Sequence, residues 1–265
     1  MLSSIRSATT TAMAALALCA GAHAQAISAS FNPNPVAPGV PVTVTAVNAT
    51  GADLELPSPC GWYVIHAFVP GGANVTPSVF CPQVIVPVPS GGSFSYTWDQ
   101  KDGNGVQVPP GVYWFELKAW DAGFTTLHHD YFCISIQSPP AAALTNQTPA
   151  KVGATLAMQI DAPLAPGAFY LTLASFTSNN PLPLPSGGLS CLDFDALLQL
   201  TLGAPNPLYF PNFRGFLDGS GKSSGLALNI PALPVLANKP LKVQSFMLTG
   251  STITPTNGLS FAIAP

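Results

Sequence analysis

The fold is decided by the stretch Trp98-Asp99-Gln100-Lys101-Asp102-Gly103-Asn104-Gly105-Val106-Gln107-Val108-Pro109-Pro110-Gly111-Val112-Tyr113. It joins two runs with strand-like alternation, Ser93–Trp98 and Val112–Trp120, through a segment rich in Asp, Asn and Gly. Asp and Asn side chains bond the backbone of a turn, and glycine adopts the positive φ angles that many turns need. We expect such angles at Gly103 and Gly105. The stretch therefore predicts a β-sandwich protein.

Short strands separated by turn residues continue on both sides of this stretch. Val40–Asn48 alternates along its length, and Trp62–Val69 carries bulky residues on both faces, which is typical of a fully buried strand. Pro87 interrupts Val84–Val88 and places that strand at a sheet edge, because proline has no N–H to donate. Further strands are expected at Leu54–Leu56 and Tyr131–Ile136. About seven strands with turn signals every 8–12 residues predict an immunoglobulin-like sandwich.

The second half of the chain also consists of short alternating segments separated by turn residues, but it does not repeat the sequence of the first half. Cys191–Leu202 fits either a strand pair or a short helix, and Pro139–Ala143 resembles a linker because its two prolines block helix and central strand alike. We therefore predict an all-β chain with two tandem sandwich domains, residues 25–138 and 144–265. Strands of the second domain are expected at Thr155–Ile160, Ala168–Phe176, Ser224–Ile230, Leu241–Leu248 and Leu259–Ile263.

The first 24 residues resemble a secretory signal peptide. Arg6 supplies the positive charge, Ala12–Ala22 is apolar, and Ala22-His23-Ala24 fits a small-residue cleavage site. The apolar run is shorter than the about 20 residues that span a bilayer. A lipidated Cys19 is the alternative, although Leu18 is bulky for the preceding position. We expect a mature chain from Gln25 that is secreted, periplasmic or at the cell surface, without a transmembrane segment.

Four cysteines remain in that mature chain, and their even number in an exported protein permits disulfides. Cys60 and Cys81 bracket one strand–loop unit and are the favoured pair. A Cys133–Cys191 bond would have to join the two domains, so that pairing stays open. No Cys-x-x-Cys occurs, which removes the usual motif for a redox or zinc-ribbon site.

The composition of the chain argues against several classes of function. Charged residues are only 7% of the chain and the formal net charge is −3. The sequence has no basic patch, so nucleic acid and anionic membrane surfaces are not expected as partners. No Gly-x-Ser-x-Gly elbow occurs, and the acids available for paired-carboxylate catalysis are chiefly Asp193 and Asp195. We predict a protein that is not an enzyme and has no cofactor.

Two groups of side chains could in principle hold a metal ion. Asp99, Asp102 and Asn104 offer oxygen ligands for Ca²⁺, but Lys101 stands within the loop, so turn capping is the favoured role. His128 and Asp130 share a strand face, and His66 could join them from another strand. A shared metal ion would require the correct face, strand pairing and distance for all three side chains at once. We therefore predict no metal site.

Aromatic side chains could alternatively bind sugars. Trp62, Trp98 and Trp114 lie on strands where a sandwich usually places its core, so we expect Trp98 and at least one of the other two to be buried. Trp120 precedes Asp121-Ala122-Gly123 and is the one expected near a loop. Carbohydrate binding therefore remains a third alternative for function.

The first half resembles the BsuPI-type proteinase inhibitor domain. The resemblance covers roughly residues 40–136 and is carried by Val42–Thr50, Leu54–Leu56, Trp62–Ile65, Ser90–Asp99 and Asp102–Tyr113, the last of which matches the closing hairpin of that family. The same Trp-Asp…Gly…Val-Pro-x-Gly-x-Tyr pattern is similar to the immunoglobulin-like module of hook-capping proteins. The second half faintly resembles a β-module of exported bacterial proteins of unknown function, through Gly225–Pro231, Pro240–Phe246 and Asn257–Ile263.

These observations lead to one expected function and two alternatives. We expect an exported, non-catalytic structural or protein-interaction module whose protein partner is unknown. The resemblance implies proteinase inhibition as the alternative, through a rigid loop presented in extended form. The loop expected to do this is braced by Cys60–Cys81 and comprises Pro70, Gly71, Gly72, Ala73, Asn74, Val75, Thr76 and Pro77.

Overall fold

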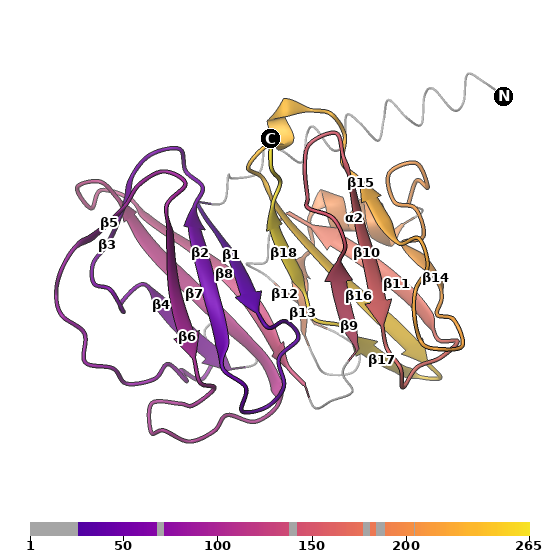
Figure 1. The fold of residues 1–265 in the computed structure, drawn as a ribbon, viewed down its shortest axis with the longest axis horizontal. Helices are drawn as coiled ribbons and strands as arrows, with labels where there is room; N and C mark the ends of the chain where they lie inside the picture. Colours follow the sequence, from indigo (N-terminus) through magenta and orange to yellow (C-terminus); the bar gives the residue numbers. More distant parts are fainter. Residues whose placement is uncertain (1–25, 68–71, 138–141, 177–180, 184–188, 204) are drawn as a thin grey trace.

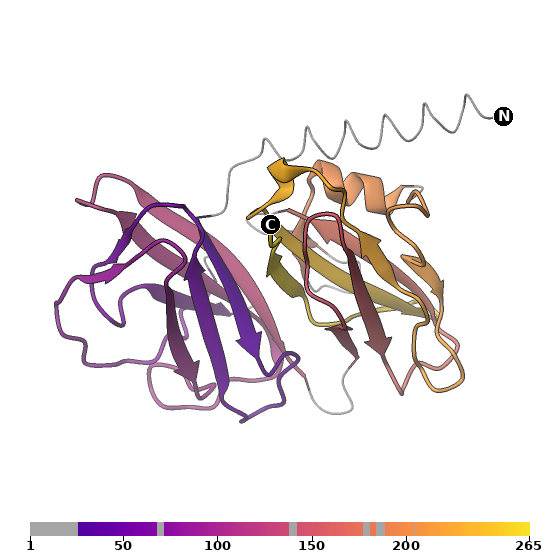
Figure 2. The same cartoon turned by 45° about the horizontal axis from the view of Figure 1, so that its top comes forward.

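The computed structural model describes residues 26–67, 72–137, 142–176, 181–183, 189–203 and 205–265. It is built almost entirely from antiparallel strands, which confirms the predicted all-β class. Figure 1 shows two sandwiches side by side, and the view in Figure 2 gives the same arrangement. The predicted signal peptide, residues 1–24, and most of the predicted linker lie outside the described residues.

The first sandwich packs two sheets face to face. One sheet has the order β1-β2-β6, and the other has the order β4-β7-β3-β5, with β8 also paired to β7. Short β5 pairs only with β3, so Pro87 does lie in an edge strand as predicted. The strands are β1 (Ile27–Asn32), β2 (Val42–Asn48), β3 (Leu54–Leu56), β4 (Tyr63–Ala67), β5 (Val86–Val88), β6 (Ser93–Trp98), β7 (Gly111–Asp121) and β8 (Leu127–Ile136).

The deciding stretch carries the chain from one sheet to the other. Strand β6 pairs with β2, whereas β7 pairs with β3, β4 and β8, so the stretch is a crossover and not the hairpin that the resemblance implied. The buried Trp98 side chain anchors the crossover, because its Nε1 donates to the Lys101 carbonyl at 2.9 Å and its ring packs on Tyr113 at 5.3 Å. Aromatic packing between the sheets thus decides the topology.

The turn inside this stretch is built largely as expected. Asp102 Oδ1 accepts hydrogen bonds from the backbone N–H groups of Asn104 and Val106, each at 2.9 Å. Gly105 has φ +75°, but Gly103 does not adopt a positive φ. Gly103 is needed for space instead, because a Cβ there would lie 3.2 Å from Ser78 Oγ and 3.3 Å from the Thr76 carbonyl oxygen.

The second sandwich has its own core. One sheet has the order β15-β10-β9; the other has the order β14-β11-β16-β17, with β18 also paired to β16, and β12 pairs with β13 alone. Its buried apolar side chains form a cluster separate from that of the first sandwich. The strands are β9 (Ala143–Asn146), β10 (Thr155–Asp161), β11 (Phe169–Ser175), β12 (Pro181–Pro183), β13 (Leu189–Asp193), β14 (Arg214–Phe216), β15 (Ala227–Asn229), β16 (Pro240–Thr249), β17 (Thr252–Pro255) and β18 (Leu259–Ala262).

The ambiguous segment Cys191–Leu202 is a strand followed by a helix. Strand β13 ends at Asp193, and helix α2 (Ala196–Leu202) follows at once. Asp195 caps the helix, since its side chain accepts a hydrogen bond from Leu198 N at 2.8 Å. Leu197 and Leu198 bury the inner side of the helix. The side-chain cap of Asp195 therefore favours a helix after β13, a choice that hydrophobic periodicity alone could not make between a helix and a strand pair.

Candidate functional site

A disulfide joins Cys60 to Cys81 as predicted, with the two Cα atoms 5.9 Å apart. Part of the expected interaction loop, Pro70–Pro77, pairs with β4. Pro70 and Gly71 lie outside the described residues, and Ala73 and Val75 exchange backbone hydrogen bonds with Ala67 and Ile65 of β4, each at 2.8 Å. The middle of the loop is thus paired to the sheet, while Ala73 and Asn74 remain exposed.

A longer exposed segment follows it at Ser78–Ile85, which we name the clamped loop. It has no regular secondary structure, and Cys81 ties its middle to Cys60. Phe80 is 98% exposed, and no charged residue occurs between Thr76 and Val88. Three further apolar side chains of the loop are about half exposed: Val79, Val84 and Ile85. An exposed apolar cluster on a covalently anchored loop is typical of a contact surface.

The second disulfide, Cys133–Cys191, joins the two sandwiches. Both sulfur atoms are buried beside Trp114. Gly258 of the second domain packs closely against this bond, since a Cβ there would lie 2.9 Å from Cys191 Cβ, 3.1 Å from Cys191 Sγ and 3.7 Å from Cys133 Sγ. Asn34 of the first domain also donates a hydrogen bond from Nδ2 to the Gly258 carbonyl oxygen at 2.9 Å. The pairing that sequence reasoning left open is therefore part of a closely packed domain junction.

Ionisable side chains are buried in the same junction. Lys242 of β16 is 3% exposed, and its Nζ lies 3.7 Å from the centre of the Phe132 ring in the first domain. Burial lowers the pKa of Lys242 to about 7, although the charges of Asp130 and Asp193 oppose this. Burial also raises the pKa of Asp130 to about 6, against the hydrogen bond that its Oδ2 accepts from Ile27 N at 3.0 Å.

The acids predicted as a possible pair have separate structural roles. Asp193 ends β13 and is buried near Lys242. Asp195 caps α2 and also accepts hydrogen bonds from Phe176 N at 2.6 Å and Ser175 Oγ at 3.0 Å. Burial raises the pKa of Asp195 despite these bonds. The two carboxylates do not share a strand face, because the strand ends between them.

A second cluster lies on the outer face of the first sandwich, around Glu116. Its carboxylate meets His66 Nε2 at 2.9 Å, Lys118 Nζ at 3.1 Å and His129 Nδ1 at 3.7 Å. Burial alone would raise the pKa of Glu116, but the hydrogen bonds from His66 and Lys118 outweigh it and leave the pKa lowered. The described residues include no group of three His, Cys, Asp or Glu side chains placed to hold a metal ion.

His66 contacts Glu116 and is not brought together with the two residues considered beside it as metal ligands, His128 and Asp130. Register pairs Lys118 with His129 and Leu117 with Asp130, so His129 lies on the Glu116 face while Asp130 points to the opposite side. The carboxylates of Asp99 and Asp102 are likewise occupied by turn N–H groups, from Lys101 in the first case and from Asn104 and Val106 in the second. These bonds lower the pKa of Asp102, in line with the capping role.

Aromatic side chains offer little for sugar binding. Trp62, Trp98 and Trp114 are all buried, as expected for the core. Trp120 is half-buried and packs against Phe124 at 5.9 Å. Among the tryptophans, only Trp120 therefore retains exposed ring surface that could stack on a sugar.

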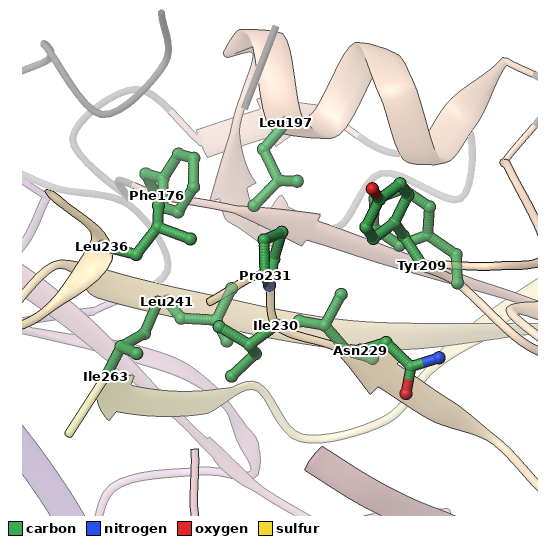
Figure 3. Close-up of a pocket in the computed structure, with 11 residues that line it drawn as sticks. Phe176, Leu197, Tyr209, Asn229, Ile230, Pro231, Leu236, Leu241 and Ile263 are labelled. Atoms are coloured by element: carbon green, nitrogen blue, oxygen red, sulfur yellow. The ribbon is translucent and has the colours of Figure 1, made fainter. Parts of the chain in front are cut away.

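The second sandwich contains a small apolar cavity, shown in Figure 3. Phe176, Leu197, Leu236 and Ile263 are among the side chains around it, with Tyr209 and Asn229 at its side. Its volume is only ≈20 Å³, about enough for one water molecule, and apolar voids of this kind usually stay dry. The cavity is a gap in core packing and offers no chemistry.

Comparison with known proteins adds only coarse information. No family model and no curated protein matches the chain, so nothing specific to the BsuPI-type domain supports that resemblance. Among solved structures, the chain is similar to a red sea bream transglutaminase at 12% identity and TM-score 0.29, covering 92% of this chain and 32% of that one. A Salmonella alpha-2-macroglobulin reacted with methylamine shows 16% identity and TM-score 0.23, covering 92% and 15%.

Fibronectin(III)-like modules of Clostridium thermocellum CbhA show 7% identity and TM-score 0.26, covering 90% of this chain and 94% of theirs. This chain thus spans a third or less of the transglutaminase and macroglobulin chains. None of these similarities carries a function to this chain. No helix in the described residues is long and apolar enough to cross a membrane. Two disulfides fit an oxidising compartment.

Proposed function

We propose that the chain is an exported, non-catalytic β-sandwich module that binds a protein partner through the clamped loop, Ser78–Ile85. The observation that carries this proposal is the 98% exposure of Phe80 one residue before a disulfide-bonded cysteine. A large aromatic side chain exposed to this degree stabilises nothing in its own domain. Buried in the pocket of a partner, the same side chain would be a typical binding hot spot.

The chemistry of the loop favours a protein as the partner. The loop is uncharged, and Pro77 and Pro82 lack the N–H groups needed for pairing in a sheet. The Cys60–Cys81 bond restricts its conformations, so little ordering entropy is lost on binding. A partner with a concave apolar pocket matches this surface, whereas a polyanion or an anionic lipid surface would require cationic side chains.

The test is site-specific photocrosslinking in the cells that produce the full chain. A photoreactive phenylalanine analogue at position 80 is expected to give one defined protein adduct. The same analogue at Phe216, a 72% exposed phenylalanine of the second domain, serves as the matched control. The purified adduct protein should then bind the wild-type chain at least about tenfold more tightly than the Phe80→Ala variant. Equal adducts from both positions, or equal affinities, would contradict the proposal.

The second candidate function is proteinase inhibition through the same loop. The favouring observation is an uncharged loop without regular secondary structure, with an exposed phenylalanine beside a covalent anchor. Chymotrypsin has an apolar specificity pocket and trypsin has a carboxylate in its pocket. Residues 25–265 should titrate chymotrypsin to a one-to-one end point and remain intact, and Phe80→Lys should transfer inhibition to trypsin. Absence of inhibition, or cleavage after Phe80, would reject this candidate.

A further inference from the structure

The domain junction encloses three ionisable side chains that no proposed binding role uses. Lys242, Asp130 and Asp193 are 3%, 9% and 7% exposed, and they come from three strands: β16 and β13 of the second domain and β8 of the first. We call these residues, together with Phe132, the junction cluster. Buried charged groups are costly unless they are paired, so a cluster of this kind makes an interface sensitive to its protonation state.

The junction cluster lies between the two domains, so it would become exposed to water if the domains moved apart. Lys242 extends from the second domain onto the Phe132 ring of the first, at 3.7 Å from Nζ to the ring centre. Asp130 lies two residues before Phe132 and ties β8 to β1 through Ile27 N. Strand β1 in turn contacts β18 of the second domain. Separation at β1 and β18 would therefore let water reach Lys242.

Few other charges face this lysine. Asp130 and Asp193 act on it directly, and His128 and His129 act on Asp130 from the same strand β8. The neighbours of Lys242 in its own sheet are uncharged: Ser175 of β11 and Ser260 of β18. The protonation state of Lys242 is thus governed by burial and two carboxylates.

We propose that the domain junction is a pH-sensitive lock, which protonation of Lys242 loosens and deprotonation closes, while the Cys133–Cys191 disulfide keeps the domains tethered in both states. The proposal goes beyond binding at the clamped loop and does not depend on it.

The direction follows from linkage. The pKa of Lys242 is about 7 in the closed junction, against 10.5 for the group in water. The open junction therefore binds more protons between these values, and the closed state gains stability as pH rises from about 7. The pKa of Asp130, about 6, lies below this window. Asp130 is ionised throughout it and contributes little to the change.

Amide hydrogen exchange of the full disulfide-bonded chain tests the lock. The amides of Ile27 and of Leu259–Ala262 report on the two strands that meet at the junction. After correction for intrinsic rates, these amides should exchange on the order of tenfold faster at about pH 6.5 than at about pH 9. Amides in the centre of β2 provide the internal reference and should keep the same protection. Equal protection of Ile27 at both pH values would overturn the proposal.

Substitutions of Lys242 distinguish the effect of this lysine on amide exchange from general effects of pH on the protein. Lys242→Met removes the titrating group and should exchange at the same corrected rate at both pH values, whereas Lys242→Arg should exchange fast at both. Lys151→Met removes an exposed lysine and should behave as wild type. A Lys242→Met chain that retains the wild-type pH dependence would overturn the assignment to Lys242.

Discussion

Cys133 of strand β8 is covalently bonded to Cys191 of strand β13, so a disulfide spanning 58 residues of sequence connects the two sandwiches. Both cysteines are buried, and Trp114 packs against the bond. The domains are consequently joined by a covalent bond, an apolar cluster and a buried lysine at one place.

Replacing both cysteines of this bond should destabilise the chain more than replacing the other pair. Closing a 58-residue loop corresponds to about 4 kcal/mol, and closing the 21-residue loop between Cys60 and Cys81 to about 3 kcal/mol. Urea unfolding of the Cys133→Ala/Cys191→Ala and Cys60→Ala/Cys81→Ala chains measures both values. A smaller loss for the first pair would mean that the junction does not depend on its covalent bond.

Gly258→Ala should disturb the junction through packing alone. The new methyl group would lie 2.9 Å from Cys191 Cβ, so backbone or disulfide must shift, at a cost of about 1–3 kcal/mol. Gly219→Ala is the matched control, because a Cβ there meets no atom within 4 Å. Thermal unfolding compares the two variants. Equal melting temperatures of the two variants would show that the junction accommodates a methyl group at Gly258 without cost.

Asp130 should impose a pH dependence on stability between about pH 4 and 6. Burial raises the pKa of Asp130 to about 6 from 3.8, so the folded chain binds this proton more tightly than the unfolded chain. Stability should therefore fall as pH rises through this window, by at most about 3 kcal/mol. Urea unfolding at several pH values should show that Asp130→Asn lacks this contribution. An unchanged slope in the variant would assign the effect to other groups.

Phe80→Ala should leave stability unchanged. The side chain is 98% exposed, and surface substitutions of this kind stay within about 0.5 kcal/mol. Phe115→Ala, at a fully buried phenylalanine of β7, should cost about 4 kcal/mol. Thermal melts of both variants make the comparison. A large destabilisation by Phe80→Ala would mean that Phe80 packs within its own domain and is not free to bind a partner.

Local sequence patterns were sufficient to predict the strands of the first domain except β1, which was missed, and its first disulfide. Alternation and turn residues predict a strand because they act through neighbours two to four positions apart. The Cys60–Cys81 bond also encloses only a short segment. The pairing of Ala73 and Val75 with β4 was not predicted, because it depends on a partner strand and leaves no period-2 signature of its own.

From the sequence alone, the all-β class, most strand positions, the first disulfide, and the burial of Trp98 with at least one of Trp62 and Trp114 were predictable. Only the tertiary structure decided that β6 and β7 lie in opposite sheets, that Cys133 meets Cys191, and that Lys242 is buried against Phe132. The physical reason is range. Strands and turns arise from contacts between near neighbours, whereas the junction is formed by residues more than 50 positions apart, whose pairing no local pattern indicates.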